Sequence, residues 1–110
     1  MTEKYSDVPM TRRASIRWKK PDDSMAIFVA TETVSFTDIR GKDRTTGVHL
    51  RVDGRSPTKW NVDKKTIGPW EDIAHFVTFK SEKEAKAFAW KWLQAAREQK
   101  TLDPDIRAHG

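Results

Sequence analysis

The chain contains no cysteine, and its longest apolar run covers only residues 25–30. The lack of cysteine excludes disulfides, thiolate catalysis and cysteine-based zinc sites. The apolar run is far shorter than the roughly 20 residues that a membrane-spanning helix needs, and residues 2–20 lack the apolar stretch of a signal peptide. We therefore expect a soluble, cytoplasmic protein with no membrane partner.

Residues typical of catalytic sites are also few. The three histidines, His49, His75 and His109, are not at metal-ligand spacing, and a zinc site would need carboxylates to complete it. Gly41–Gly47 differs from a phosphate-binding loop because its lysine follows the first glycine and no Ser/Thr pair follows it. We expect a protein that is not an enzyme, with no catalytic residue, no metal and no cofactor.

Positive charge is abundant and unevenly placed. The net charge of the whole chain is +5. Residues 1–20 contribute +4 of it, and residues 21–80 are balanced. A basic arm of this kind serves solvation or binds a polyanion such as nucleic acid.

The clearest local signal predicts a helix over residues 81–99. Ser81 and Glu84 have the spacing of a capping box, in which each side chain bonds the other residue's backbone N–H. Apolar residues then recur with a helical period of 3.6. This stripe consists of Ala85, Phe88, Ala89, Trp92, Leu93 and Ala96.

Alternating and β-branched segments predict strands over residues 14–18, 25–36, 47–53, 58–63 and 74–80. Residues 27–29 suggest a central strand that is buried on both faces, and Val48, Leu50 and Val52 are expected to face inward. Asp53-Gly54 predicts a turn. The expected fold class is α+β, with an antiparallel sheet of four to five strands and one C-terminal helix packed on one face.

The expected domain organisation is simple. Residues 1–11 form a flexible basic arm, residues 12–100 a single α+β domain, and residues 101–110 a flexible tail.

The segment from Phe76 to Phe88, where the last expected strand enters the helix, resembles the end of the sheet-plus-helix domains of integrase arm-binding proteins and certain plant regulators. The resemblance implies a sheet that enters the major groove of DNA. No base-reading residue of those families can be carried over to this chain, so the resemblance supplies no site residue.

Cations interleaved with aromatic residues favour nucleic acid as the partner, because cations bind phosphates and aromatic rings stack on bases. We expect a small non-enzymatic regulatory or accessory protein; DNA and RNA are not distinguished. The candidate contact residues are Arg12, Arg13, Arg17, Lys19, Arg40, Lys42, Arg44, Arg51, Lys59 and Asn61.

The alternative is a protein-interaction module, such as a small inhibitor or adaptor. Trp90 lies off the apolar stripe of the expected helix, on the side that carries Lys86 and Arg97. Aromatic and arginine residues dominate interface hot spots. These three residues are therefore candidates for binding a protein partner, or a second copy of the chain in a homodimer.

Overall fold

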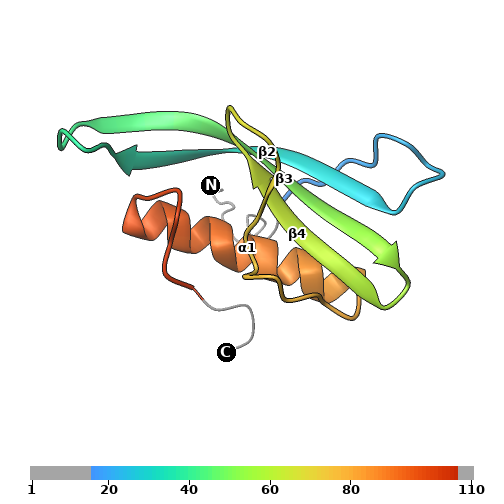
Figure 1. Cartoon of the computed structure of the whole chain (residues 1–110). Coiled ribbons are helices and arrows are strands. Elements are labelled where there is room, and N and C mark those ends of the chain that lie inside the picture. The colour runs from blue at the N-terminus through green and yellow to red at the C-terminus, as the bar shows by residue number, and fades with distance from the viewer. Residues whose placement is uncertain (1–15, 107–110) are drawn as a thin grey trace, which may run out of the picture.

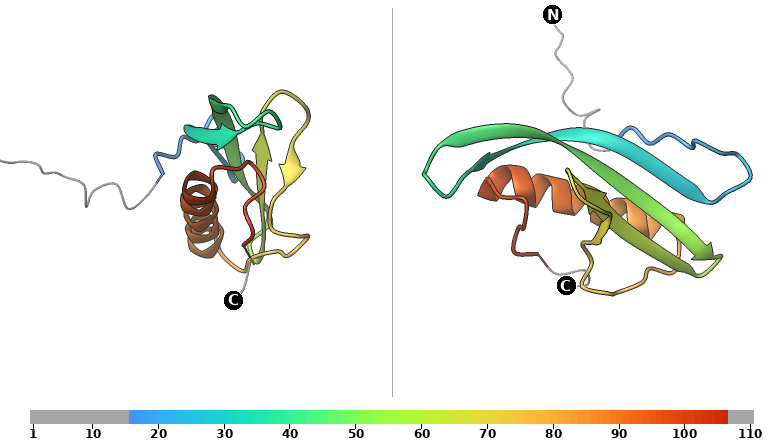
Figure 2. Two further views of the ribbon diagram at one scale, coloured as in Figure 1. Left: turned by 90° about the vertical axis from the view of Figure 1, so that its left-hand side faces the viewer. Right: turned by 45° about the horizontal axis from the view of Figure 1, so that its top comes forward.

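The computed structural model describes residues 16–106, which form an α+β domain with a four-stranded antiparallel sheet (Figure 1). The strand order is β2-β3-β4-β5, and the single helix α1 packs against one face, as a second view shows (Figure 2). The fold class expected from the sequence is confirmed. The elements are β2 (Ile27–Thr37), β3 (Asp43–Ser56), β4 (Lys59–Lys65), β5 (Glu71–Asp72) and α1 (Glu82–Gln99).

The core lies between α1 and the inner face of the sheet. Val48, Leu50 and Val52 of β3 are fully buried, as expected from their alternation with polar residues. Val62 of β4 and Leu93 of α1 are equally buried. Burial of each such side chain contributes about 1.5–3 kcal/mol before conformational entropy is subtracted.

Helix α1 follows the sequence prediction closely. Ser81 is the N-cap, and its hydroxyl accepts a hydrogen bond of 3.2 Å from the Glu84 N–H. Within residues 16–106 the reciprocal bond to the Glu84 carboxylate is absent, so half of the capping box forms. The buried helix residues are the six of the predicted stripe. No helix in this part of the chain is long and apolar enough to cross a membrane.

Strand β3 continues through Asp53-Gly54, so the turn predicted there is wrong. The chain turns at Pro57-Thr58 instead. Gly54 lies against the indole of Trp60, and a Cβ at Gly54 would be 2.8 Å from two of the ring carbons. The glycine therefore permits close approach of a ring and does not form a turn.

The expectation of a central strand over residues 27–29 is also wrong, because β2 is at the edge of the sheet. Residues 27–29 are only half-buried, and the buried positions of β2 are Ala30 and Val34. A run of β-branched and aromatic residues indicates a strand but does not distinguish an edge from a centre.

Two other expected strands do not form. Residues 16–18 are irregular, and pairing near them is limited to a bridge between Lys19 and Val29; Ala14 and Ser15 lie outside the described residues. Residues 74–80 are irregular apart from a bridge between Trp60 and Phe79. His75 and Phe76 have φ angles of 53° and 65°, which no strand accommodates.

The chain after α1 packs on the domain as far as the structure describes it. Pro104 is buried, and Leu102 and Ile106 lie against the core. The Gln99 side chain accepts a hydrogen bond of 2.8 Å from the Asp105 N–H. Residues 101–106, the described part of the expected tail, are thus in contact with the helix and the core.

Candidate nucleic-acid interface

The candidate contacts Arg40 and Lys42 lie in a short turn at the end of a two-stranded ribbon. β4 pairs with β3 only from His49 onward, so residues 32–37 of β2 and 43–48 of β3 pair with each other alone. We call residues 32–48 the ribbon and its turn, residues 38–42, the tip. In Figure 1 the tip lies at the far end of the sheet from the β3–β4 turn.

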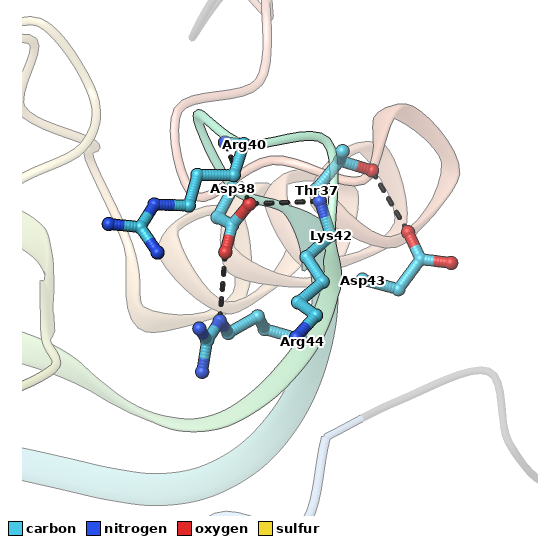
Figure 3. Close-up of polar contacts among 6 residues, drawn as sticks. All are labelled: Thr37, Asp38, Arg40, Lys42, Asp43 and Arg44. Carbon is cyan, nitrogen blue, oxygen red and sulfur yellow. Dashed lines mark hydrogen bonds and ion pairs between the residues drawn. The ribbon is translucent and has the colours of Figure 1, made fainter.

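Asp38 organises the tip. One carboxylate oxygen accepts hydrogen bonds of 2.9 Å from the backbone N–H groups of Arg40 and Lys42, and the other accepts one of 2.9 Å from Arg44 Nε (Figure 3). These donors, the Arg44 guanidinium first, lower the pKa of Asp38. Gly41, at φ 76°, closes the turn by donating its N–H to the Asp38 carbonyl.

Two of the candidate contact residues near the tip keep their side chains outside these contacts. Arg40 and Lys42 are exposed and bond Asp38 only through their backbone N–H groups, and neither forms an ion pair within residues 16–106. Figure 3 shows the Arg40 guanidinium directed away from the Asp38 carboxylate. Arg44 is on β3 and holds Asp38, although it remains 57% exposed. The tip therefore presents Arg40 and Lys42 to a ligand.

A second group of cations gathers where β2 begins. The backbone of Lys19 forms two hydrogen bonds with Val29, of 2.8 and 2.9 Å, which fixes the segment that carries the exposed Arg17 and Lys19 beside β2. Lys20 Nζ is 5.5 Å from the centre of the Phe28 ring. On the other side, Lys86 Nζ of α1 is 3.7 Å from the same ring and 6.0 Å from that of Trp18. The sequence did not predict this cation–aromatic cluster, because its members are far apart along the chain.

The centre of the outer face is engaged internally. The Arg51 guanidinium donates two hydrogen bonds, of 3.1 and 3.0 Å, to Asp63 and lies 4.3 Å from the Trp70 ring centre. Burial raises the pKa of the Asp63 carboxyl, and the facing Asp72 adds to this, although Arg51 opposes it. Arg51, a predicted phosphate contact, is thus held by the sheet. Trp70 stacks on this guanidinium.

The remaining predicted contacts divide between exposed and unplaced residues. Lys59 is exposed at the start of β4, and Asn61 is half-buried opposite Asp53 of β3. Arg12 and Arg13 lie outside the described residues. The structure thus assembles no single cationic patch from the predicted set. The described members lie either near the tip or at the opposite end of the sheet, where β2 begins and β3 turns into β4, and Arg51 lies between these two ends.

Hydroxyl groups along the ribbon are a feature that the sequence reasoning missed. Thr31 bonds His49 across the strands at 2.9 Å, Ser35 bonds Thr45 at 2.9 Å, and Thr37 bonds Asp43. The signal was present in the sequence, since Thr31, Thr33, Ser35 and Thr37 alternate with larger residues. These side chains face away from α1, and hydroxyls of this kind commonly bond phosphate oxygens.

The residues proposed to bind a protein partner are largely used within the fold. Arg97 donates hydrogen bonds to the Thr33 carbonyl at 3.0 Å and to Glu32 Oε1 at 3.1 Å, which covers the open edge of β2. Lys86 bonds Glu82 at 2.7 Å besides its contact with Phe28. Trp90, which the sequence places off the apolar stripe, is half-buried and packs against the core, so it is not the exposed side chain expected of a contact residue. Lys86 and Arg97 on this side of the helix contact residues of β2, although Arg97 remains 41% exposed.

Other chemistry finds little support in the described residues. No group of three or more histidine and acidic side chains within residues 16–106 is arranged to hold a metal ion. No protein-family model, curated protein or solved structure matches the chain. The arrangement of the site is therefore the basis for any functional assignment.

Proposed function

We propose that the protein is a small, non-enzymatic nucleic-acid-binding protein, acting as a regulatory or accessory factor. The observation that carries the proposal is the ribbon. Its outer face is polar and hydroxyl-rich, no helix covers it in the described residues, and its tip presents Arg40 and Lys42. A two-stranded antiparallel ribbon fits a groove of duplex DNA, and its Arg, Lys and Thr side chains suit phosphate contacts.

Cations at the two ends of β2 match the extended form of such a ligand. Lys19 lies beside Val29, and the eight residue steps from Val29 to Thr37 span about 26 Å at the usual rise per residue, so Lys19 and the tip are separated by roughly that distance. Between them, Arg51 and Asp63 neutralise each other. A polyanion that runs along the ribbon would be held mainly at its two ends.

The test is a titration of fluorescently labelled oligonucleotides, one single-stranded and one a duplex of about 20 base pairs, over a range of salt concentrations. We expect binding at low salt that weakens linearly in log–log form, because each phosphate contact releases counterions. Deletion of residues 1–13, which include Arg12 and Arg13, should weaken binding relative to the full chain at the same salt concentration, without lowering thermal stability. Failure of the full chain to bind either oligonucleotide at low salt would contradict the proposal.

Protein interaction remains a second candidate because of an apolar surface elsewhere. Phe76 is 90% exposed and sits beside an open groove of about 470 Å³, whose lining includes Val77, Phe79 and Phe88. Large exposed aromatic residues next to a groove are typical of contact sites. Sedimentation of the parent chain and of Phe76→Ser tests self-association. A parent dimer that dissociates in the variant supports this candidate, whereas monomers in both cases reject a homodimer.

A further inference from the structure

Ile39 is an apolar side chain held in water at the tip of the ribbon. Its relative exposure is 103%, so it contributes nothing to the core. The turn does not require it either. The hydrogen bond from the Gly41 N–H to the Asp38 carbonyl places Ile39 at the second position of the turn, which most residues tolerate.

The turn is also braced against collapse. The Asp38 carboxylate holds the backbone on both sides of the tip through Arg40 and Lys42, and the Asp38 N–H donates to the Lys42 carbonyl at 2.9 Å. These bonds hold the backbone on both sides of Ile39 in place, and the side chain is fully exposed there. An apolar group fixed in this way is preorganised for insertion into a ligand.

The charges around Ile39 indicate what that ligand is. Arg40 and Lys42 follow it within the tip, and hydroxyl-bearing residues line the ribbon behind it. The minor groove of DNA, roughly 6 Å wide, attracts cations, and proteins that bind there insert single apolar side chains between base steps and bend the duplex. We propose that Ile39 is such a wedge: it enters the minor groove, Arg40 and Lys42 bind the adjacent phosphates, and the DNA bends. This inference rests on the proposed nucleic-acid binding and adds that the ligand is duplex DNA.

An anionic membrane offers the same combination of negative charge and an apolar interior, but the structure favours DNA. Even a whole myristoyl chain holds a protein on a bilayer only marginally, and one isoleucine buries much less. Within residues 16–106 no second exposed large apolar side chain lies in the tip. A wedge between base steps needs only one apolar side chain.

The chain contains a matched control. Ile67 is 99% exposed in the loop between β4 and β5, and its neighbours Thr66, Gly68 and Pro69 carry no charge. Ile67→Ala removes the same apolar group from an equally exposed site outside the ribbon, where the nearest lysines along the chain, Lys64 and Lys65, are buried or half-buried on β4. Ile39→Met, in contrast, keeps an apolar side chain at the tip and serves as a rescue variant.

The experiment measures bending by energy transfer between dyes at the two ends of a 25-base-pair duplex with a central A·T-rich segment. We expect the full chain to shorten the end-to-end distance, corresponding to a bend of roughly 20–90°. Ile39→Ala should abolish most of the shortening and weaken binding about tenfold, with an unchanged salt slope, whereas Ile67→Ala and Ile39→Met should behave as the parent chain. Because Ile39 is fully exposed, thermal unfolding should be the same for all variants.

Four results would overturn the inference. Salt-dependent binding without bending, or equal behaviour of Ile39→Ala and the parent chain, would reject the wedge and leave the proposed function intact. Loss of binding to phosphatidylserine vesicles in Ile39→Ala, with DNA binding unaffected, would assign the tip to a membrane. Absence of binding to any oligonucleotide would reject the proposed function and the wedge together.

Discussion

The tip of the ribbon and the centre of the sheet each contain an aspartate bound to an arginine, and the fold shifts the pKa of the two carboxyls in opposite directions. Asp38 accepts three N–H donors and its pKa is lowered. Asp63 accepts only from Arg51, is 8% exposed and faces Asp72, and its pKa is raised. The number of donors and the degree of burial, not the presence of an arginine, set the direction.

This contrast implies different roles for the two pairs. The Arg51–Asp63 pair joins β3 to β4 on a face that Trp70 covers, so it belongs to the architecture of the sheet. The Asp38–Arg44 pair closes an exposed turn that no core residue depends on. Substitutions at the first pair should therefore alter stability, and substitutions at the second should alter what the tip presents to a ligand.

The largest effect on stability is expected from Arg51→Ala. The substitution leaves the Asp63 carboxylate buried without its partner and removes the cation from the Trp70 ring. Loss of one partner of a fully buried pair costs about 3–5 kcal/mol, and the partial exposure of Arg51 reduces this to about 2–3 kcal/mol. Urea unfolding of the variant measures the loss of unfolding free energy. A loss below about 0.5 kcal/mol is typical of ordinary surface positions and would contradict a structural role for the pair.

Trp70→Ala should have a smaller effect of the same sign. It removes the ring that lies 4.3 Å from the Arg51 guanidinium but leaves both hydrogen bonds to Asp63. A partly desolvated cation–π contact contributes about 1–2 kcal/mol. A double-mutant cycle with Arg51→Ala separates this contact from simple loss of ring burial, because a true contact makes the two losses less than additive.

The pH dependence of stability distinguishes the two aspartates directly. The pKa of Asp63 is higher in the folded chain than in the unfolded chain, so the folded chain binds the proton more tightly. This carboxyl therefore makes the protein more stable as the pH falls from the raised pKa of the folded chain to the ordinary aspartate pKa. Asp38 acts in the opposite direction: its contribution is complete above the ordinary aspartate pKa and is lost as pH falls through the lowered value. Asp63→Asn should remove the first trend, as urea unfolding at several pH values would show, whereas the contribution of the exposed Asp38 is small. Retention of the first trend in Asp63→Asn would contradict the assignment.

The smallest effect on stability is expected from Asp38→Ala. The pair is at the surface, so the unfolding free energy should stay within experimental error. The Lys42 N–H loses its carboxylate acceptor, so its amide hydrogen exchange should become faster. Exchange that is unchanged in the variant would show that the Asp38 carboxylate does not brace the tip.

The sequence predicted the features that depend on neighbouring residues. The cap at Ser81 and the buried stripe of α1 follow from spacings within one helix, and the inward residues of β3 follow from alternation. Gly54 misled the prediction because glycine has the same local signature whether it turns the chain or admits a ring such as Trp60. Arg51 could not be distinguished from Arg44 as a ligand contact, because the cross-strand register that places Asp63 opposite Arg51 is not encoded locally. Ile39 was missed because a single apolar residue in a polar loop gives no periodic signal.

The most direct test of the account compares the salt dependence of duplex DNA binding in two double variants that each remove two positive charges. Arg40→Ala/Lys42→Ala changes the tip, and Lys83→Ala/Lys91→Ala changes exposed positions of α1. We predict that the tip variant lowers the slope of log affinity against log salt by about 1.8, which corresponds to two lost phosphate contacts, and that the helix variant leaves the slope unchanged. Equal slopes in the two variants would contradict the assignment of the ribbon tip as the nucleic-acid contact.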